Sequence, residues 1–211
     1  MGLYAVGQVS SGIHGAERLG GNSLAAEALA MGRRTGESAA KRAMKVSAPR
    51  IDWDCIEEER RRIFTPSERK EGMQAFARKK QIRHMMYDKV GIIRHEEGLK
   101  EAISRILRLS KECSNRLYVA DKHTRYNSEL VRAIEVLFML DYAEVIARAA
   151  LFRTENRGCH YREDYAERDN KNWCVETGIQ LRKGEIDVYK KPVEFAYLKP
   201  GEVGYPEDWL L

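Results

Sequence analysis

An arginine set among small residues is the side chain in this sequence best suited to bind a ligand. Arg18 lies in the glycine-rich segment 10–23. Glycine neighbours allow the backbone to approach a ligand closely. A guanidinium can bind a carboxylate through two parallel hydrogen bonds. Arg18 is therefore a candidate carboxylate-binding residue, although on spacing alone a surface arginine in a turn remains the more frequent alternative.

The end of the same segment is a second candidate site, because a helix is expected to begin there. Gly20 and Gly21 precede Asn22 and Ser23, either of which suits a helix N-cap, and residues 24–42 are rich in strong helix formers. Free N–H groups at a helix start favour an anion or a partly negative carbonyl. An ordinary capped helix is the simpler alternative, since no complete phosphate-binding loop of the G-x-G-x-x-G or P-loop type is present.

The histidines and cysteines do not predict a metal site. The five histidines are scattered, and no two of the four cysteines have C-x-x-C spacing, which compact zinc and iron–sulfur sites use. We expect the cysteines to be reduced, as in a cytoplasmic protein. We identify no catalytic acid, base or nucleophile from the residues.

The composition is that of a globular protein. Of the 211 residues 43% are hydrophobic and 33% are charged, with a formal net charge of +5. The excess of positive charge is small and spread over the first half of the chain, so no nucleic-acid partner is predicted. No apolar run is long enough to span a membrane, and the first residues do not have the pattern of a signal peptide.

Three zones make up the predicted fold, which is mainly α with small β parts. Residues 1–46 are predicted to form a strand at Leu3–Val6, the glycine segment and a helix. Residues 47–153 are predicted to be a helical bundle, with a helix near 96–114 and with Thr65 capping a helix whose first turn holds Pro66. Residues 154–211 form a tail with a β-hairpin.

Two parts of the later zones give sharper expectations. The last long helix is apolar around most of its surface, so it should be the central and most buried member of the bundle. Its predicted buried stripe consists of Val131, Ile134, Phe138, Tyr142, Val145, Ala149 and Phe152. The hairpin pairs 179–182 with 185–189 around Lys183-Gly184, and a further short strand is expected within 191–198. The polar run from His160 to Asp169 is interpreted as a solvated or interface loop with several ion pairs, each of which contributes little if exposed.

Three segments together resemble a known family. Residues 2–8 (GLYAVGQ) and 14–24 (HGAERLGGNSL) resemble the end of the FAD-binding domain in succinate dehydrogenase and fumarate reductase flavoprotein subunits. Residues 88–99 are similar to the helical domain of that family, and 154–169 (TENRGCHYREDYAERD) to its signature after the last long helix. The resemblance covers essentially the whole chain, in order.

The resemblance implies a role for particular residues. Arg18 matches the arginine that binds a carboxylate of the dicarboxylic substrate. Ser23 and Leu24, with Asn22 before them, match the helix start whose backbone contacts the flavin ring. Gln8 stands where most members carry a glutamate that holds the FAD ribose, and its amide oxygen can still accept a hydrogen bond.

It also implies how the chain is organised. Family members are far longer, so we expect a C-terminal portion, comprising the end of an FAD-binding α/β domain, a helical bundle and a hairpin tail. The FAD site would be incomplete in this chain. The expected partners are the chain carrying the missing N-terminal FAD-binding portion, a dicarboxylate substrate and an iron–sulfur electron-transfer subunit. The expected location is cytoplasmic, and peripheral to the inner membrane through these partners.

Two alternatives to this flavoprotein oxidoreductase remain open. The chain could be a non-catalytic assembly module derived from the family. It could also resemble L-aspartate oxidases, which share the later His-Tyr-Arg-Glu-Asp pattern but differ around 18–23, or, less closely, adenylylsulfate reductases.

Overall fold

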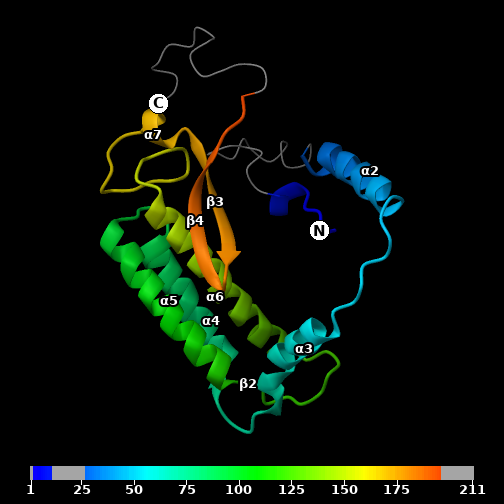
Figure 1. Ribbon diagram of the computed structural model, residues 1–211. Helices are drawn as coiled ribbons and strands as arrows, with labels where there is room; N and C mark the ends of the chain where they lie inside the picture. Colours follow the sequence, from blue (N-terminus) through cyan, green and yellow to red (C-terminus); the bar gives the residue numbers. More distant parts are fainter. Residues whose placement is uncertain (1, 11–26, 196–211) are drawn as a thin grey trace. The chain divides into compact units, whose positions relative to one another are not determined.

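A computed structural model describes residues 2–10 and 27–195 (Figure 1). The chain divides into two compact units, Met1–Ile56 and Glu57–Leu211. Over the described residues the chain is mainly helical, with one short parallel pair of strands and one antiparallel hairpin. This confirms the predicted fold class. The predicted limits at 46/47 and 153/154 stay predictions.

Three long helices form the core of the second unit. They are α4 (Ala75–Val90), α5 (Glu96–Arg116) and α6 (Ser128–Phe152), and each packs against the other two. The side chains that α5 buries recur every three or four residues, which is the period of one helix face. They are Leu99, Ala102, Ile106, Leu109 and Cys113. Burying one such large aliphatic side chain stabilises the fold by about 1.5–3 kcal/mol, so this face accounts for the formation of α5.

That α6 is the central and most buried helix stays a prediction, since each of the three helices contacts the other two. The predicted buried stripe was wrong. The face that α6 turns to those helices is made of Leu130, Ala133, Val136, Leu140, Ala143, Ala147 and Ala150. The four alanines allow close approach, since the distance between packed helices depends on the side chains at the contact. The larger residues of the predicted stripe lie on the opposite side, where Tyr142 is 70% exposed.

Helix α3 (Trp53–Glu68) differs from the prediction at its C-terminal end. Thr65 and Pro66 lie in its last turn rather than its first. The Thr65 hydroxyl donates to the Arg61 carbonyl at 2.6 Å, and the Pro66 carbonyl accepts from the Val119 N–H at 3.0 Å. Pro66 has no N–H to donate to the Arg62 carbonyl, and the helix ends two residues later. The next segment, β1 (Met73–Gln74), pairs in parallel with β2 (Leu117–Tyr118).

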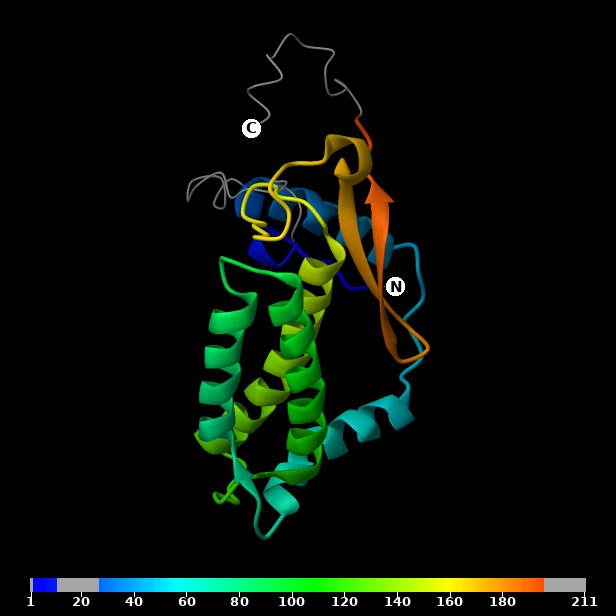
Figure 2. The same ribbon diagram turned by 90° about the vertical axis from the view of Figure 1, so that its left-hand side faces the viewer.

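The C-terminal hairpin is confirmed and is longer than predicted. Strand β3 (Val175–Arg182) pairs with β4 (Glu185–Pro192) along its whole length. The turn residues Lys183 and Gly184 have φ values of 51° and 85°, as a type I′ turn requires. The hairpin runs alongside α6 in both views (Figures 1 and 2). No further strand follows within residues 193–195, and the rest of the predicted one lies outside the described residues.

In the first unit the predicted strand is not formed. Residues 2–6 have no regular structure, and Leu3 is 93% exposed. A strand needs a neighbour to pair with, and the described part of this chain offers none there. The regular structure among the described residues of this unit consists of a 3-10 turn at Gly7–Ser10, a π-helical turn at Glu27–Met31, α2 (Gly32–Ala43) and the start of α3. The predicted helix is thus present from residue 27.

Candidate functional site

Ser10, the first residue of the glycine-rich segment, lies beside Glu27, which follows the segment in the sequence. The Ser10 hydroxyl donates to the Glu27 carboxylate at 2.9 Å. Gly7 has a φ of 73°, and a side chain placed there would meet Ala28 at 3.6 Å. Ser10, which precedes residues 11–26, and Glu27, which follows them, therefore lie within hydrogen-bonding distance of each other.

Most of the predicted site residues fall between these two ends. Arg18, Asn22, Ser23 and Leu24 lie outside the described residues. Gln8 belongs to the 3-10 turn that precedes the segment. The structure therefore positions the ends of the candidate site, and the roles of the five residues stay predictions.

The best-organised cluster of charges in the described chain lies after α6, in residues 153–169, which we name the closing loop. Its Arg162 is 1% exposed. The Arg162 guanidinium donates to the carbonyls of Ala150 and Leu151 at 2.9 and 3.2 Å, and to both oxygens of Asp164 at 2.7 and 2.6 Å. The last carbonyls of a helix lack partners within it. Arg162 thus caps α6 with a charge that Asp164 balances.

The same loop joins the end of α6 to the start of α5. Asp164 accepts from the Glu96 N–H at 2.8 Å, and the Glu163 N–H donates to the Arg94 carbonyl at 2.7 Å. Hydrogen bonding from Arg162 lowers the pKa of Asp164 to about 2, with a further contribution from the Glu96 N–H. Asp164 is therefore a carboxylate at neutral pH, and it serves two helix ends at once.

A buried carboxylate, that of Glu155, binds several residues of the closing loop. Glu155 is fully buried and accepts from the Arg157 guanidinium at 2.7 and 2.9 Å. It also accepts from the Asp169 N–H at 2.8 Å and lies 3.3 Å from the Arg153 guanidinium. Burying a charge is costly unless it is paired and hydrogen-bonded, and this one is satisfied on both oxygens.

His160 is held as a neutral side chain in this loop. Its Nδ1 lies 3.3 Å from an Arg94 nitrogen, and its Nε2 lies 3.1 Å from the Arg153 carbonyl. A guanidinium can only donate, so we assign the proton to Nε2. Burial lowers the pKa of His160, and the charges of Arg94, Arg153 and Arg162 lower it further.

The interpretation of 160–169 as a solvated or interface loop was therefore wrong for Arg162, which is buried, whereas Tyr161, Glu163 and Asp164 are exposed. Alternating charge signs do not distinguish a surface loop from a buried network. The signal that could have revealed the network is the end of α6 itself. No glycine or asparagine follows Phe152 directly to cap the helix, so another donor had to reach its carbonyls.

One cavity of the second unit lies outside the closing loop and lacks the side chains that most often act as catalytic nucleophiles or bases. It measures about 880 Å³ and lies between α6 and the hairpin, where Asp141, Val145, Ile179 and Ile186 are among its lining residues. Partial burial raises the pKa of Asp141. No histidine, cysteine or serine lines this cavity, so we do not assign catalysis to it. Over residues 2–10 and 27–195 no three His, Cys, Asp or Glu side chains gather as metal ligands would.

Within the described part of the chain, none of the helices combines the length and the apolar character that crossing a bilayer requires.

Comparison with known sequences relates the chain to flavoproteins. Residues 79–205 match the family model described as "Fumarate reductase flavoprotein C-term". The fumarate reductase flavoprotein of Haemophilus influenzae is 33% identical over 210 residues, covering 97% of this chain and 34% of the relative. The fumarate reductase flavoprotein of Proteus vulgaris is 35% identical over 185 residues, covering 83% of this chain and 30% of the relative.

Solved structures agree with this relationship. The Mycobacterium smegmatis Sdh1 complex contains a chain that superposes with a TM-score of 0.83 at 31% identity, over 93% of this chain and 34% of that chain. A chain of Escherichia coli quinol fumarate reductase gives 0.82 at 31% identity, over 95% and 35%. The fold and the matched residues are those of the C-terminal domain of a fumarate reductase or succinate dehydrogenase flavoprotein subunit. The chain belongs to the fumarate reductase and succinate dehydrogenase flavoprotein family, and it spans about a third of the length of these relatives.

The chain is also similar to an L-aspartate oxidase in sequence and to an adenylylsulfate reductase in fold. An L-aspartate oxidase of Streptomyces coelicolor is 32% identical over 186 residues, covering 85% of this chain and 30% of that protein. Adenylylsulfate reductase of Archaeoglobus fulgidus superposes with a TM-score of 0.68 over 81% of this chain and 30% of that chain, at 22% identity, which shows a common fold alone.

Proposed function

We propose that this chain is the C-terminal portion of an FAD-dependent oxidoreductase of the fumarate reductase and succinate dehydrogenase type. It would contribute part of the FAD site and part of the dicarboxylate site when joined by an upstream portion. One observation carries the proposal. The match to the Haemophilus influenzae fumarate reductase flavoprotein covers 97% of this chain, a share that takes in the segment of Arg18 as well as the bundle.

The residues of this chain suit the two ligands. The Arg18 guanidinium can bind one carboxylate of fumarate or succinate through paired hydrogen bonds. Backbone N–H groups of Ser23 and Leu24, after Asn22, can donate to a partly negative flavin carbonyl, and the Gln8 amide can bind a ribose hydroxyl. FAD, when bound, supplies the hydride acceptor or donor. The protein's contribution is to place the dicarboxylate and favour charge on the cofactor.

The hydrogen bond between Ser10 and Glu27 supports the proposed role of the segment between them in binding the ligands. A binding segment is useful only if its ends are fixed, because ordering a free loop costs conformational entropy. The hydrogen bond at 2.9 Å fixes one end against the other. It leaves 16 residues between them, numbered 11–26.

The proposal includes partners. The chain spans about a third of its relatives, so the pyrophosphate-binding part of an FAD site would come from an upstream portion. An iron–sulfur electron-transfer subunit would pass electrons to or from the flavin. The assembly would be cytoplasmic, and peripheral to the inner membrane through these partners.

The experiment compares Arg18→Ala with Arg33→Ala in the complex purified from the source organism. Arg33 is a matched control in the same unit, because its side chain is 83% exposed and pairs with Glu37 at 3.1 Å. Arg18→Ala should lower fumarate reduction and succinate oxidation at least about a hundredfold, since two charge-assisted hydrogen bonds are lost, while FAD content and assembly stay unchanged. Equal turnover in the two variants would refute the substrate role.

Two outcomes would favour the alternatives. Normal assembly without FAD or turnover would indicate a non-catalytic assembly module, which the exposed apolar side of α6 also supports. Oxidation of L-aspartate in place of succinate would indicate the L-aspartate oxidase reaction.

A further inference from the structure

The His160 ring connects two segments that are distant in the sequence. Its Nδ1 accepts a hydrogen bond from the Arg94 guanidinium at 3.3 Å, in the turn between α4 and α5. Its Nε2 donates to the Arg153 carbonyl at 3.1 Å, directly after α6. The His160 backbone is fixed as well, since it exchanges two hydrogen bonds of 2.9 Å with the Arg157 backbone. Only the neutral ring with its proton on Nε2 satisfies both side-chain contacts.

The charged groups that act on this ring are positive. The guanidinium groups of Arg94, Arg153 and Arg162 face it from the turn before α5, the end of α6 and the closing loop itself. The neighbouring thiol, that of Cys159, interacts with Arg94, and a thiol is ordinarily uncharged below pH 7. A protonated His160 would therefore be a further cation beside three others.

The nearby carboxylates do not balance that added charge, because arginines already hold them. Asp164 accepts from Arg162 at 2.7 and 2.6 Å, and Glu155 accepts from Arg157 at 2.7 and 2.9 Å. In the described part of the chain, no carboxylate makes a hydrogen bond to the His160 ring. A half-buried charge without a partner is costly, so the closed loop disfavours the protonated ring.

Protonation at Nδ1 would also break a contact. The nitrogen would then carry a hydrogen, and the Arg94 guanidinium has no acceptor to offer it. Burial and the three arginines already hold the pKa of His160 below its ordinary value of 6.5. A loop in which the ring reaches water has that ordinary value, so acid favours the opened loop below about pH 6.5. The preference grows about tenfold per pH unit until the pKa of the closed state is reached.

Two backbone amides share with the ring the attachment of the closing loop to the start of α5. The Glu163 N–H donates to the Arg94 carbonyl at 2.7 Å, and the Glu96 N–H donates to the Asp164 carboxylate at 2.8 Å. An amide hydrogen exchanges with solvent when its hydrogen bond opens. Exchange at Glu163 and Glu96 therefore reports whether the loop is attached.

We propose that His160 is an acid-sensitive latch, whose protonation at Nδ1 by solvent releases the closing loop from the start of α5. Asp164 stays ionised over the same pH range, since its pKa is about 2. The core of the bundle stays folded, because the side chains packed between α4, α5 and α6 are apolar. The latch lies within this chain and does not depend on the proposed function.

The test measures amide hydrogen exchange by NMR in the full 211-residue chain between pH 7 and pH 5, corrected for the intrinsic exchange rates. Protection at Glu163 and Glu96 should fall at least about fivefold, whereas Ile106 and Leu140, in the core, should keep theirs. The ring resonances of His160, resolved from those of its neighbour His95, should show protonation at Nδ1 with a pKa below 6.5.

Three variants assign the effect to the latch. His160→Gln keeps a donor and an acceptor but takes up no proton, so protection at Glu163 and Glu96 should no longer depend on pH. His84→Gln is the matched control, because it removes an exposed histidine of α4, and it should behave as the wild type. Arg94→Gln keeps an N–H for the ring without the charge, so it should raise the pKa of His160 and reduce the fall in protection.

Several results would overturn the proposal. They are unchanged protection of the two amides between pH 7 and pH 5, titration of the His160 ring at its ordinary pKa, and a fall that includes the core amides equally. A fall of the same size in His160→Gln would do so too. If His160→Gln does not fold, Arg94→Gln decides, because an unchanged pKa of His160 in that variant would refute the latch.

Discussion

At each end of the helical bundle, an arginine side chain caps the last carbonyls of a helix. The two arginines differ in how deeply they are buried. At one end, Arg162 caps the last carbonyls of α6 and is buried against Asp164. At the other end, Arg69 is half-buried and donates to two carbonyls at 2.6 Å, that of Ser114 in the last turn of α5 and that of Leu117 directly after the helix. The first cap needs a carboxylate because water cannot balance its charge, whereas water reaches the second. Burial, more than the number of hydrogen bonds, should therefore decide what each cap contributes.

The largest effect is expected from removing the buried cap. Arg162→Ala should lower the free energy of unfolding by about 3 kcal/mol, because it leaves buried carbonyls unsatisfied and Asp164 without its partner. Arg69→Ala should cost only about 1 kcal/mol, since water can reach the freed carbonyls. Urea unfolding followed by circular dichroism measures both. Equal losses for the two variants would show that burial does not distinguish the caps.

The two ends should also differ in their response to acid. The folded-state pKa of Asp164 is about 2, below the ordinary value of 3.8, so its contribution is present above about pH 4 and is lost as the pH falls toward 2. The loss should be about 1–2 kcal/mol, reduced by partial exposure. Thermal unfolding across this range should show it in the wild type and in Arg69→Ala. An Asp164→Asn variant that kept the same acid dependence would contradict the assignment.

The smallest effect is expected where charges lie on the surface between the two ends. Arg105 pairs with Glu101 at 2.5 Å, four residues earlier on α5, and its side chain is 50% exposed. Pairs of this kind contribute about 0.3–0.5 kcal/mol. Arg105→Ala should thus lower the urea midpoint only slightly, and the decrease should be smaller still in high salt. A loss comparable to that of Arg69→Ala would remove the distinction between capping and surface pairing.

Much of the bundle and the hairpin could be predicted from the sequence, because local patterns determine them. The period of Leu99, Ile106 and Leu109 predicts α5, and Lys183-Gly184 between alternating residues predicts the turn. The orientation of α6 could not be predicted. A helix that is apolar on two sides offers two faces, and only the presence of α4 and α5 selects the alanine-rich one. Thr65-Pro66 also misled, because a threonine followed by a proline is typical of a helix start, whereas the pair lies in the last turn of α3.

The candidate site shows a different limit of prediction. Family resemblance assigns Arg18 and the helix start at 22–24, but no periodicity or spacing points to the contact between Ser10 and Glu27. The closing loop is similar. Its residues match a family signature, yet the burial of Arg162 and Glu155 depends on two helix ends meeting in space, which charge patterns along the chain do not encode.

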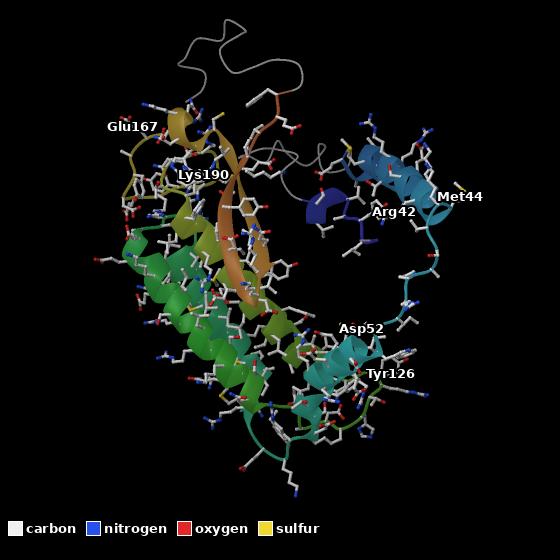
Figure 3. The ribbon with its side chains drawn as sticks, viewed as in Figure 1. Arg42, Met44, Asp52, Tyr126, Glu167 and Lys190 are labelled. Carbon is white, nitrogen blue, oxygen red and sulfur yellow. The ribbon has the colours of Figure 1, made fainter. Side chains whose placement is uncertain are left out.

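Lys190 illustrates how the hairpin joins this end of the bundle. Its ammonium lies 3.7 Å from the centre of the Trp173 ring and donates to the Asn172 carbonyl at 2.9 Å (Figure 3). Trp173 in turn packs edge-on against Phe152 at 5.5 Å. The tail is thus connected to the last turn of α6 through one aromatic side chain.

The hydrogen bond between Asp164 and Glu96 connects residues 68 positions apart, which bears on the order of folding. Helices α4, α5 and α6 are neighbours along the chain and can collapse early, whereas closing so long a loop costs entropy that only later contacts recover. We therefore expect this link to form after the transition state. Weakening it would leave the refolding rate nearly unchanged and accelerate unfolding, so the lifetime of the native state would depend on the last contact made.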